Sequence, residues 1–120
     1  MASIWFVLAG AQAIVIITND GWWGNTSGYR QHFSYSRLRA IEMRRDLVRC
    51  ANTGISAFID QKGDVLKSGP WWQADGINGT LALSSHITPF VKYGDVTGRA
   101  CVLATLLLAL AFVVRLFTRK

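Results

Sequence analysis

The fold of this chain is decided by the stretch Ile14-Val15-Ile16-Ile17-Thr18-Asn19-Asp20-Gly21-Trp22-Trp23-Gly24. Four consecutive β-branched apolar residues lead into a polar turn, a pattern typical of a short strand that is buried on both faces of its sheet. We therefore predict a parallel strand over residues 13–18 and an α/β fold. In such folds, ligands bind beyond the carboxyl ends of the strands.

The turn after this strand supplies the candidate site residues. Asn19, Asp20, Trp22 and Trp23 follow the strand directly, and His32 lies near the start of the next predicted helix. Two interpretations remain open. These residues line or support a ligand site, or Asn19 and Asp20 only shape the turn and cap the next element, while His32 only makes a partly buried polar contact.

Composition limits the classes of function. The 120 residues have room for one modest domain or for part of a larger one, and 51% of them are hydrophobic. The formal charge of +6 is not arranged as a basic stripe interleaved with aromatic residues, so no nucleic acid partner is predicted. The two cysteines make neither a disulfide framework nor a metal site, and we interpret them as small packing residues. No metal and no cofactor are predicted.

A helix is predicted over residues 28–50, with Thr26 or Ser27 as its cap. Leu38, Ile41 and Val48 recur on one face of this helix, which we take to be its core face. Four arginines fall mostly elsewhere and are interpreted as a solvated basic face: Arg37, Arg44, Arg45 and Arg49.

The following segment is rich in strand and turn signals. Strands are predicted over residues 55–59, 64–67 and 80–83, and the turn between the first two has Gly63 where a positive φ is needed. Trp71 and Trp72 are predicted to be exposed in a loop, and paired tryptophans suit a partner or a membrane interface.

The last part of the chain has the composition of a transmembrane helix. Residues 100–114 carry no charge, and Arg115, Arg119 and Lys120 follow them. The positive-inside rule then places the C-terminus in the cytoplasm and the preceding part on the outer side. We predict a domain over residues 1–96 and a transmembrane helix with a basic tail over residues 97–120.

Several short motifs in the chain occur together in one known family. The stretch from Thr18 to Gly24 is followed by Gln31-His32, Arg39-Ala40-Ile41-Glu42, Asn52-Thr53-Gly54, Thr88-Pro89-Phe90 and Gly94-Asp95, and then by a terminal apolar helix. From about residue 10 to 117, the chain resembles the C-terminal part of the bacterial apolipoprotein N-acyltransferases. These are membrane proteins with a domain of the nitrilase, or carbon-nitrogen hydrolase, superfamily. The resemblance implies part of a nitrilase-like α-β-β-α sandwich followed by one transmembrane helix.

The resemblance also implies a chemistry and a location. The family transfers an acyl chain from a phospholipid to the N-terminal cysteine amine of an apolipoprotein, in the bacterial inner membrane with the soluble part in the periplasm. A Glu-Lys-Cys triad forms a thioester, which the amine then opens. The triad is expected upstream of Met1, so no catalytic residue is assigned in this fragment, which we expect to be inactive alone. Cys50 does not match the nucleophile.

Four further residues match family motifs without a direct role in the chemistry: Arg39, Glu42, Asn52 and Gly54. We expect them to be structural, with Arg39 and Glu42 forming an ion pair. Two other functions stay open. The first is a true carbon-nitrogen hydrolase that acts on small amides. The second is a non-enzymatic, membrane-anchored binding protein that uses Trp71 and Trp72 at the lipid surface.

Overall fold

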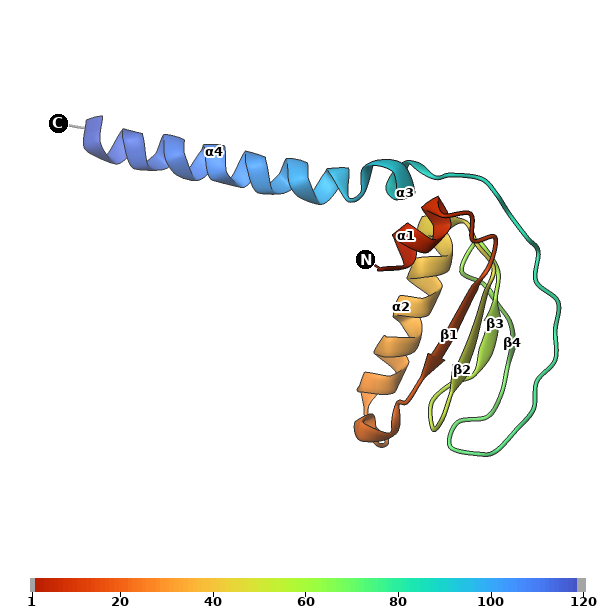
Figure 1. Ribbon diagram of the computed structural model, residues 1–120. Helices are drawn as coiled ribbons and strands as arrows, with labels where there is room; N and C mark the ends of the chain where they lie inside the picture. Colours follow the sequence, from red (N-terminus) through yellow and green to blue (C-terminus); the bar gives the residue numbers. More distant parts are fainter. Residues whose placement is uncertain (1, 119–120) are drawn as a thin grey trace.

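The computed structural model describes residues 2–118, in which helices cover one face of a four-stranded sheet and one long helix projects away from both (Figure 1). The elements in chain order are α1 (Ala2–Leu8), β1 (Ile14–Thr18), the 3-10 helix η1 (Gly21–Trp23), α2 (Ser27–Met43), β2 (Leu47–Ala51), β3 (Ala57–Ile59), β4 (Val65–Ser68), α3 (Pro89–Tyr93) and α4 (Val96–Thr118). The predicted α/β class is confirmed.

The sheet has the order β1-β2-β3-β4. The first two strands are parallel, with Ile14 opposite Leu47 and Thr18 opposite Ala51, and α2 forms the crossover between them. The other pairs are antiparallel. The turn before β4 contains Gly63 at φ +86°, so the predicted hairpin is confirmed.

Helix α2 ends at Met43, so the predicted helical extension to Cys50 is wrong. Arg44 adopts a left-handed conformation (φ 48°, ψ 53°), and its N–H donates to the carbonyl oxygens of Ala40 and Ile41. The chain then turns into β2. The usual glycine signal for a helix end is missing here because an arginine takes the left-handed position.

The buried face of α2 also differs from the predicted one. Leu38 and Ile41 are 42% and 41% exposed, whereas Tyr29, Ala40 and Met43 are buried. The helical spacing that linked Leu38 and Ile41 to Val48 was coincidental, since Val48 lies on a strand.

Strand β1 buries one face rather than both. Ile14 and Ile16 pack toward the core under α2, but Val15 and Ile17 are 67% and 84% exposed on the opposite face. Within residues 2–118, no second layer of regular structure covers that face.

The predicted strand over residues 80–83 is not formed. This part of the chain belongs to a long extended connector that runs from β4 to α3 (Figure 1). The Ala82 N–H donates to the Asp46 carboxylate at 2.6 Å, and the Ser84 N–H donates to the Gln12 carbonyl at 3.1 Å. These isolated bonds replace the regular ladder that a strand needs.

Two small hydrophobic clusters hold the layers together. The first lies between α2 and the sheet and contains the fully buried residues Ala40, Leu47, Ala57 and Ile59. The second joins α1, α2 and α3 through Val7, Met43 and Val91. The N-terminal helix and the helix before α4 are therefore packed on the same end of α2.

Arg45 is 1% exposed, which corrects its assignment to a solvated face. Its guanidinium donates to the carbonyl oxygens of Ala11 at 2.9 Å and His86 at 2.7 Å, and to the Ser84 hydroxyl at 3.2 Å. Burial lowers the pKa of Arg45, but the guanidinium stays charged because it is a very strong base. One side chain thus fixes both the turn before β1 and the connector before α3.

Replacing Arg45 by methionine tests this role. We expect Arg45→Met to destabilise the protein by about 2 kcal/mol or more, because the carbonyl oxygens of Ala11 and His86 lose the donor that holds them together. Thermal unfolding followed by circular dichroism in detergent micelles measures the change. Arg44→Met is the matched control, since Arg44 is exposed. Equal destabilisation by the two substitutions would contradict this role for Arg45.

Candidate functional site

A buried ion pair lies at the carboxyl end of β1. Asp20, two residues beyond the end of the strand, accepts a hydrogen bond from the Arg49 guanidinium of β2 at 2.7 Å. Their side chains are 0% and 1% exposed. The same guanidinium donates to the Ser36 hydroxyl of α2 at 2.7 Å. Arg49 is thus a second correction to the predicted solvated face.

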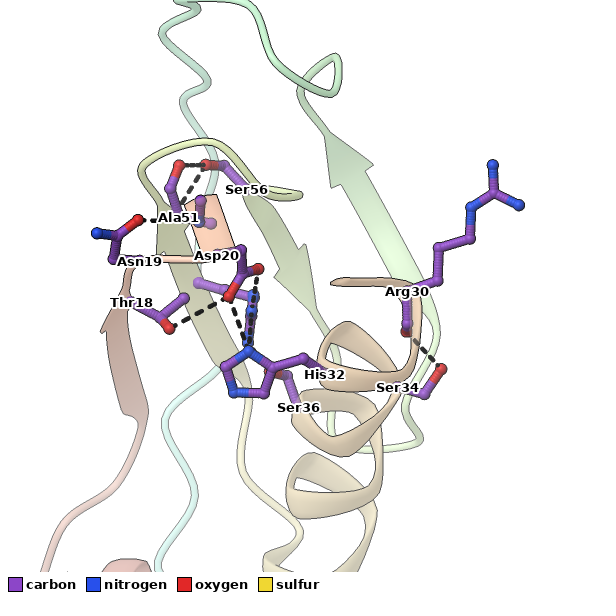
Figure 2. A network of polar contacts seen from close by, with 11 residues as sticks. Thr18, Asn19, Asp20, Arg30, His32, Ser34, Ser36, Ala51 and Ser56 are labelled. Carbon is purple, nitrogen blue, oxygen red and sulfur yellow. Dashed lines mark hydrogen bonds and ion pairs between the residues drawn. The ribbon is translucent and has the colours of Figure 1, made fainter. Parts of the chain in front are cut away.

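His32 joins this network from the first half of α2. Its Nδ1 lies 2.7 Å from the other Asp20 carboxylate oxygen, and its side chain is 39% exposed (Figure 2). A carboxylate only accepts, so the contact with Asp20 requires a proton on Nδ1. The Arg49 guanidinium lies 3.2 Å from the same nitrogen, so His32, Asp20 and Arg49 meet at one point. The partly buried contact foreseen for His32 is present, and a role in a ligand site stays a prediction.

The protonation of Asp20 is set by its neighbours. Burial alone would raise the pKa of this carboxyl group, but the hydrogen bonds and charges of Arg49 and His32 outweigh burial and hold the pKa below its ordinary value. Asp20 is therefore an anion at neutral pH. It orients the imidazole and compensates the buried guanidinium at the same time.

The turn after Asp20 displays its tryptophans. The Gly21 N–H donates to the Asn19 side chain at 3.0 Å, which is the turn-shaping contact expected for Asn19. Trp22 is 80% exposed and Trp23 is 44% exposed. Thr26 caps α2, as predicted, and its hydroxyl also donates to the Trp23 carbonyl at 2.6 Å.

Gly54 lies against the carboxylate of Asp20. A Cβ placed on Gly54 would lie 2.1 Å from the Asp20 Oδ2 atom, so only glycine fits beside the ion pair. The neighbouring Asn52 donates its backbone N–H to the Thr18 carbonyl at 3.0 Å and continues the β1–β2 ladder. Both residues thus contact the end of β1.

The remaining residues predicted from sequence lie outside this network. Arg39 and Glu42 form an ion pair one turn apart on α2. Burial raises the pKa of Glu42, and Arg39 counteracts part of that effect. Cys50 is exposed rather than a packing residue, as is Cys101.

Trp71 is not free, which corrects its predicted exposure. Its ring stacks on Tyr29 with centroids 5.1 Å apart, and Tyr29 is 5% exposed at the start of α2. Trp72 is 51% exposed and lies next to it. This stacking attaches the connector between β4 and α3 to the N-terminal end of α2, where the candidate site lies.

The arrangement offers hydrogen-bonding groups, and no thiol among residues 2–118 belongs to it. The open Nε2 of His32 and the exposed amide of Asn19 are the groups that a ligand could reach. Among residues 2–118, no three His, Cys, Asp or Glu side chains lie close enough together to hold a metal ion. The predicted absence of a metal or cofactor stays a prediction.

Comparison with known proteins places the chain in a family. The profile of the family described as Carbon-nitrogen hydrolase matches residues 1–87. The chain belongs to the carbon-nitrogen hydrolase family. The match begins before residue 10, where the resemblance from motifs began.

Individual relatives show which members of this family the chain is similar to. The chain is 41% identical over 110 residues to the apolipoprotein N-acyltransferase of Chlorobaculum tepidum and 43% identical over 108 residues to that of Geobacter metallireducens. It is 49% identical over 79 residues to that of Allorhizobium ampelinum. These matches cover 92%, 89% and 65% of this chain but only 21%, 21% and 15% of the relatives. The predicted resemblance is confirmed, and the chain spans about a fifth of the length of these relatives.

Sequence reasoning missed Arg49 and Ser36. The alternation of Leu47, Arg49 and Ala51 toward one side, with Val48 and Cys50 toward the other, was the available signal. It was hidden because residues 47–51 were read as the end of a helix.

Replacing Gly54 by alanine tests the close contact with Asp20. We expect Gly54→Ala to disturb the ion pair and destabilise the protein by about 2 kcal/mol, in the range of overpacking. Gly76→Ala is the matched control, since nothing lies within 4 Å of its added Cβ. Thermal unfolding compares the two variants. A Gly54→Ala protein as stable as Gly76→Ala would rule out this contact.

The lowered pKa of Asp20 makes stability depend on pH. Its ionised form stabilises the fold above about pH 4, and this contribution is lost as pH falls further. We expect Asp20→Asn to cost about 3 kcal/mol at pH 7, because Arg49 loses its counter-charge. The gap between wild type and variant should narrow from pH 5 to pH 3. Unfolding midpoints across this range measure it, and a constant gap would contradict the assignment.

Proposed function

We propose that this chain forms part of an apolipoprotein N-acyltransferase, which transfers an acyl chain from a phospholipid to the N-terminal cysteine amine of an apolipoprotein. One observation carries this proposal. The match to the Chlorobaculum tepidum protein spans 110 of 120 residues, so it necessarily includes residues 11–110 and most of α4. The similarity therefore continues past the α/β layer into an apolar helix.

Helix α4 supports a membrane setting. It has 23 residues, most of them apolar, and the protein buries none of them. A helix of this length and composition can cross a bilayer. In the proposed topology, α4 crosses the bacterial inner membrane, the preceding residues lie in the periplasm, and Arg115, Arg119 and Lys120 keep the C-terminus in the cytoplasm.

Within the proposed enzyme, this chain supplies a supporting wall of the active site. Asn19, Trp22, Trp23 and His32 line or support the site, and Asp20 positions His32. The Glu-Lys-Cys triad comes from parts of the enzyme other than this chain. The thiolate attacks the phospholipid ester and releases the lysophospholipid, and the amine of the apolipoprotein then opens the thioester and restores the thiol.

The two other functions have less support. A hydrolase of small amides has no need of an exposed apolar helix such as α4. A lipid-binding protein that uses Trp71 and Trp72 together would need both rings free, and Trp71 stacks on Tyr29.

A chimeric enzyme tests the proposal. Residues 11–110 replace the matching segment of the Chlorobaculum tepidum acyltransferase, and acyl transfer to a diacylated lipopeptide is measured by mass spectrometry. We expect activity from the chimera and none from the 120-residue chain alone. Asp20→Asn in the chimera should lower kcat at least tenfold by releasing His32, while Gly76→Ala should change it less than twofold.

Two results of this experiment would contradict two different parts of the proposal. A chimera that accumulates in membranes, binds lipid and has no activity would overturn the proposed function. Transfer by the purified 120-residue chain would overturn the proposal that the triad lies elsewhere.

A further inference from the structure

A groove lies where α1, α3 and the first turn of α4 meet. Its volume is about 290 Å³, and its lining includes Ile4, Trp5, Leu8, Phe90, Tyr93 and Arg99. In Figure 1, α1 and α3 lie at the N-terminal end of α4, on the side of the protein from which that helix projects. This α1–α3 groove is distinct from the candidate site.

The groove and the candidate site lie at opposite ends of α2. Met43, at the C-terminal end of α2, packs against Val7 of α1 and Val91 of α3. The candidate site and the stacked Tyr29 lie at the other end of α2. Seventeen helical residues span about 25 Å at 1.5 Å per residue, so the groove and the candidate site are at opposite ends of the protein layer.

The side chains around the groove combine exposed aromatic and apolar surface with cations. Trp5, Leu8 and Tyr93 are 73%, 50% and 56% exposed. The Lys92 ammonium lies 5.2 Å from the centre of the Tyr93 ring, and Arg99 lies on the first turn of α4. Tryptophan and tyrosine favour the headgroup level of a bilayer, and lysine and arginine favour its phosphates.

The connection to α4 keeps this surface next to the helix. Only Gly94 and Asp95 separate α3 from α4. The Gly94 N–H donates to the Phe90 carbonyl at 2.8 Å, and the Gly98 N–H donates to the Asp95 carboxylate at 2.7 Å. The groove therefore lies within about one helical turn of the first residue of α4.

We propose that the α1–α3 groove docks on the phospholipid headgroups and upper acyl chains of the leaflet that α4 enters. The groove is continuous with α4. Its two cations, Lys92 and Arg99, outnumber its one carboxylate, Asp95, which already accepts from the Gly98 N–H, so its net positive charge complements lipid phosphates. Trp5 and Leu8 sit among the upper acyl chains while Lys92 and Arg99 contact phosphates. The surface orients the α/β layer on the membrane and is not the acyl-donor site. This inference rests on the proposed crossing of the membrane by α4.

Brominated lipids test the docking directly. The full chain is reconstituted in phosphatidylcholine vesicles brominated at acyl positions 6,7 or 11,12, and the quenching of tryptophan fluorescence is measured. Trp5 is one of five tryptophans, so we expect about a fifth of the emission to be quenched, more by the 6,7 than by the 11,12 lipid. Trp5→Phe should abolish this component.

Controls separate docking from folding and from insertion. Trp72→Phe removes an exposed tryptophan next to Trp71 at the other end of α2 and should leave the quenched component intact. Lys92→Gln with Arg99→Gln should reduce quenching of Trp5, whereas Lys92→Arg should not. Quenching that is unchanged in Trp5→Phe, or absent in wild type, overturns the inference if the protein floats with the vesicles. A protein that does not float overturns the membrane crossing by α4 as well.

Discussion

The buried pair of Asp20 and Arg49 is the interaction on which the candidate site depends. It joins the end of β1 to the middle of β2, and through Ser36 and His32 it joins both strands to α2. A buried charge without its partner is far more costly than a neutral replacement of both. The two residues are therefore constrained as a unit, and Gly54 is constrained with them because its missing side chain leaves room for the carboxylate.

The sequence predicts the strand over residues 14–18 and the exposed turn after it. A β-branched run that ends in Asn-Asp-Gly is compatible with few structures other than a strand followed by a turn. The sequence placed Asp20 and His32 in one candidate site but did not predict the ion pair of Asp20 with Arg49, because Arg49 was assigned to the surface of a helix. That error came from one residue. Arg44 ends α2 in a left-handed conformation that sequence reasoning expects of glycine, so the helix was extended through β2. The missing strand at 80–83 has a similar cause, because Asp46 binds that backbone in place of a neighbouring strand.

Two charged residues in the loop between α2 and β2 connect the ends of the protein. Arg45 binds the turn before β1 and the connector before α3, and Asp46 binds the β3–β4 turn and the middle of that connector. These contacts fix the path by which the chain leaves the sheet and reaches α3. The orientation of α3, and with it the start of α4, is consequently determined by the same loop that begins β2.

The exposed face of β1 connects these observations with the proposed function. Val15 and Ile17 alternate with Ile14 and Ile16, so the first four positions of the strand carry apolar residues on both faces. In the part of the chain that the structure describes, only one face is covered, and the other leaves β-branched residues in solvent at a cost of about 25 cal/mol per Å² of apolar surface. A second sheet packed on that face would remove the cost. The proposed acyltransferase is about five times as long as this chain, as its relatives are, and offers the residues for such a layer. Among residues 2–118, no regular element covers this face and no thiol belongs to the Asp20–Arg49–His32 network. In the proposed enzyme, both would come from parts other than this chain.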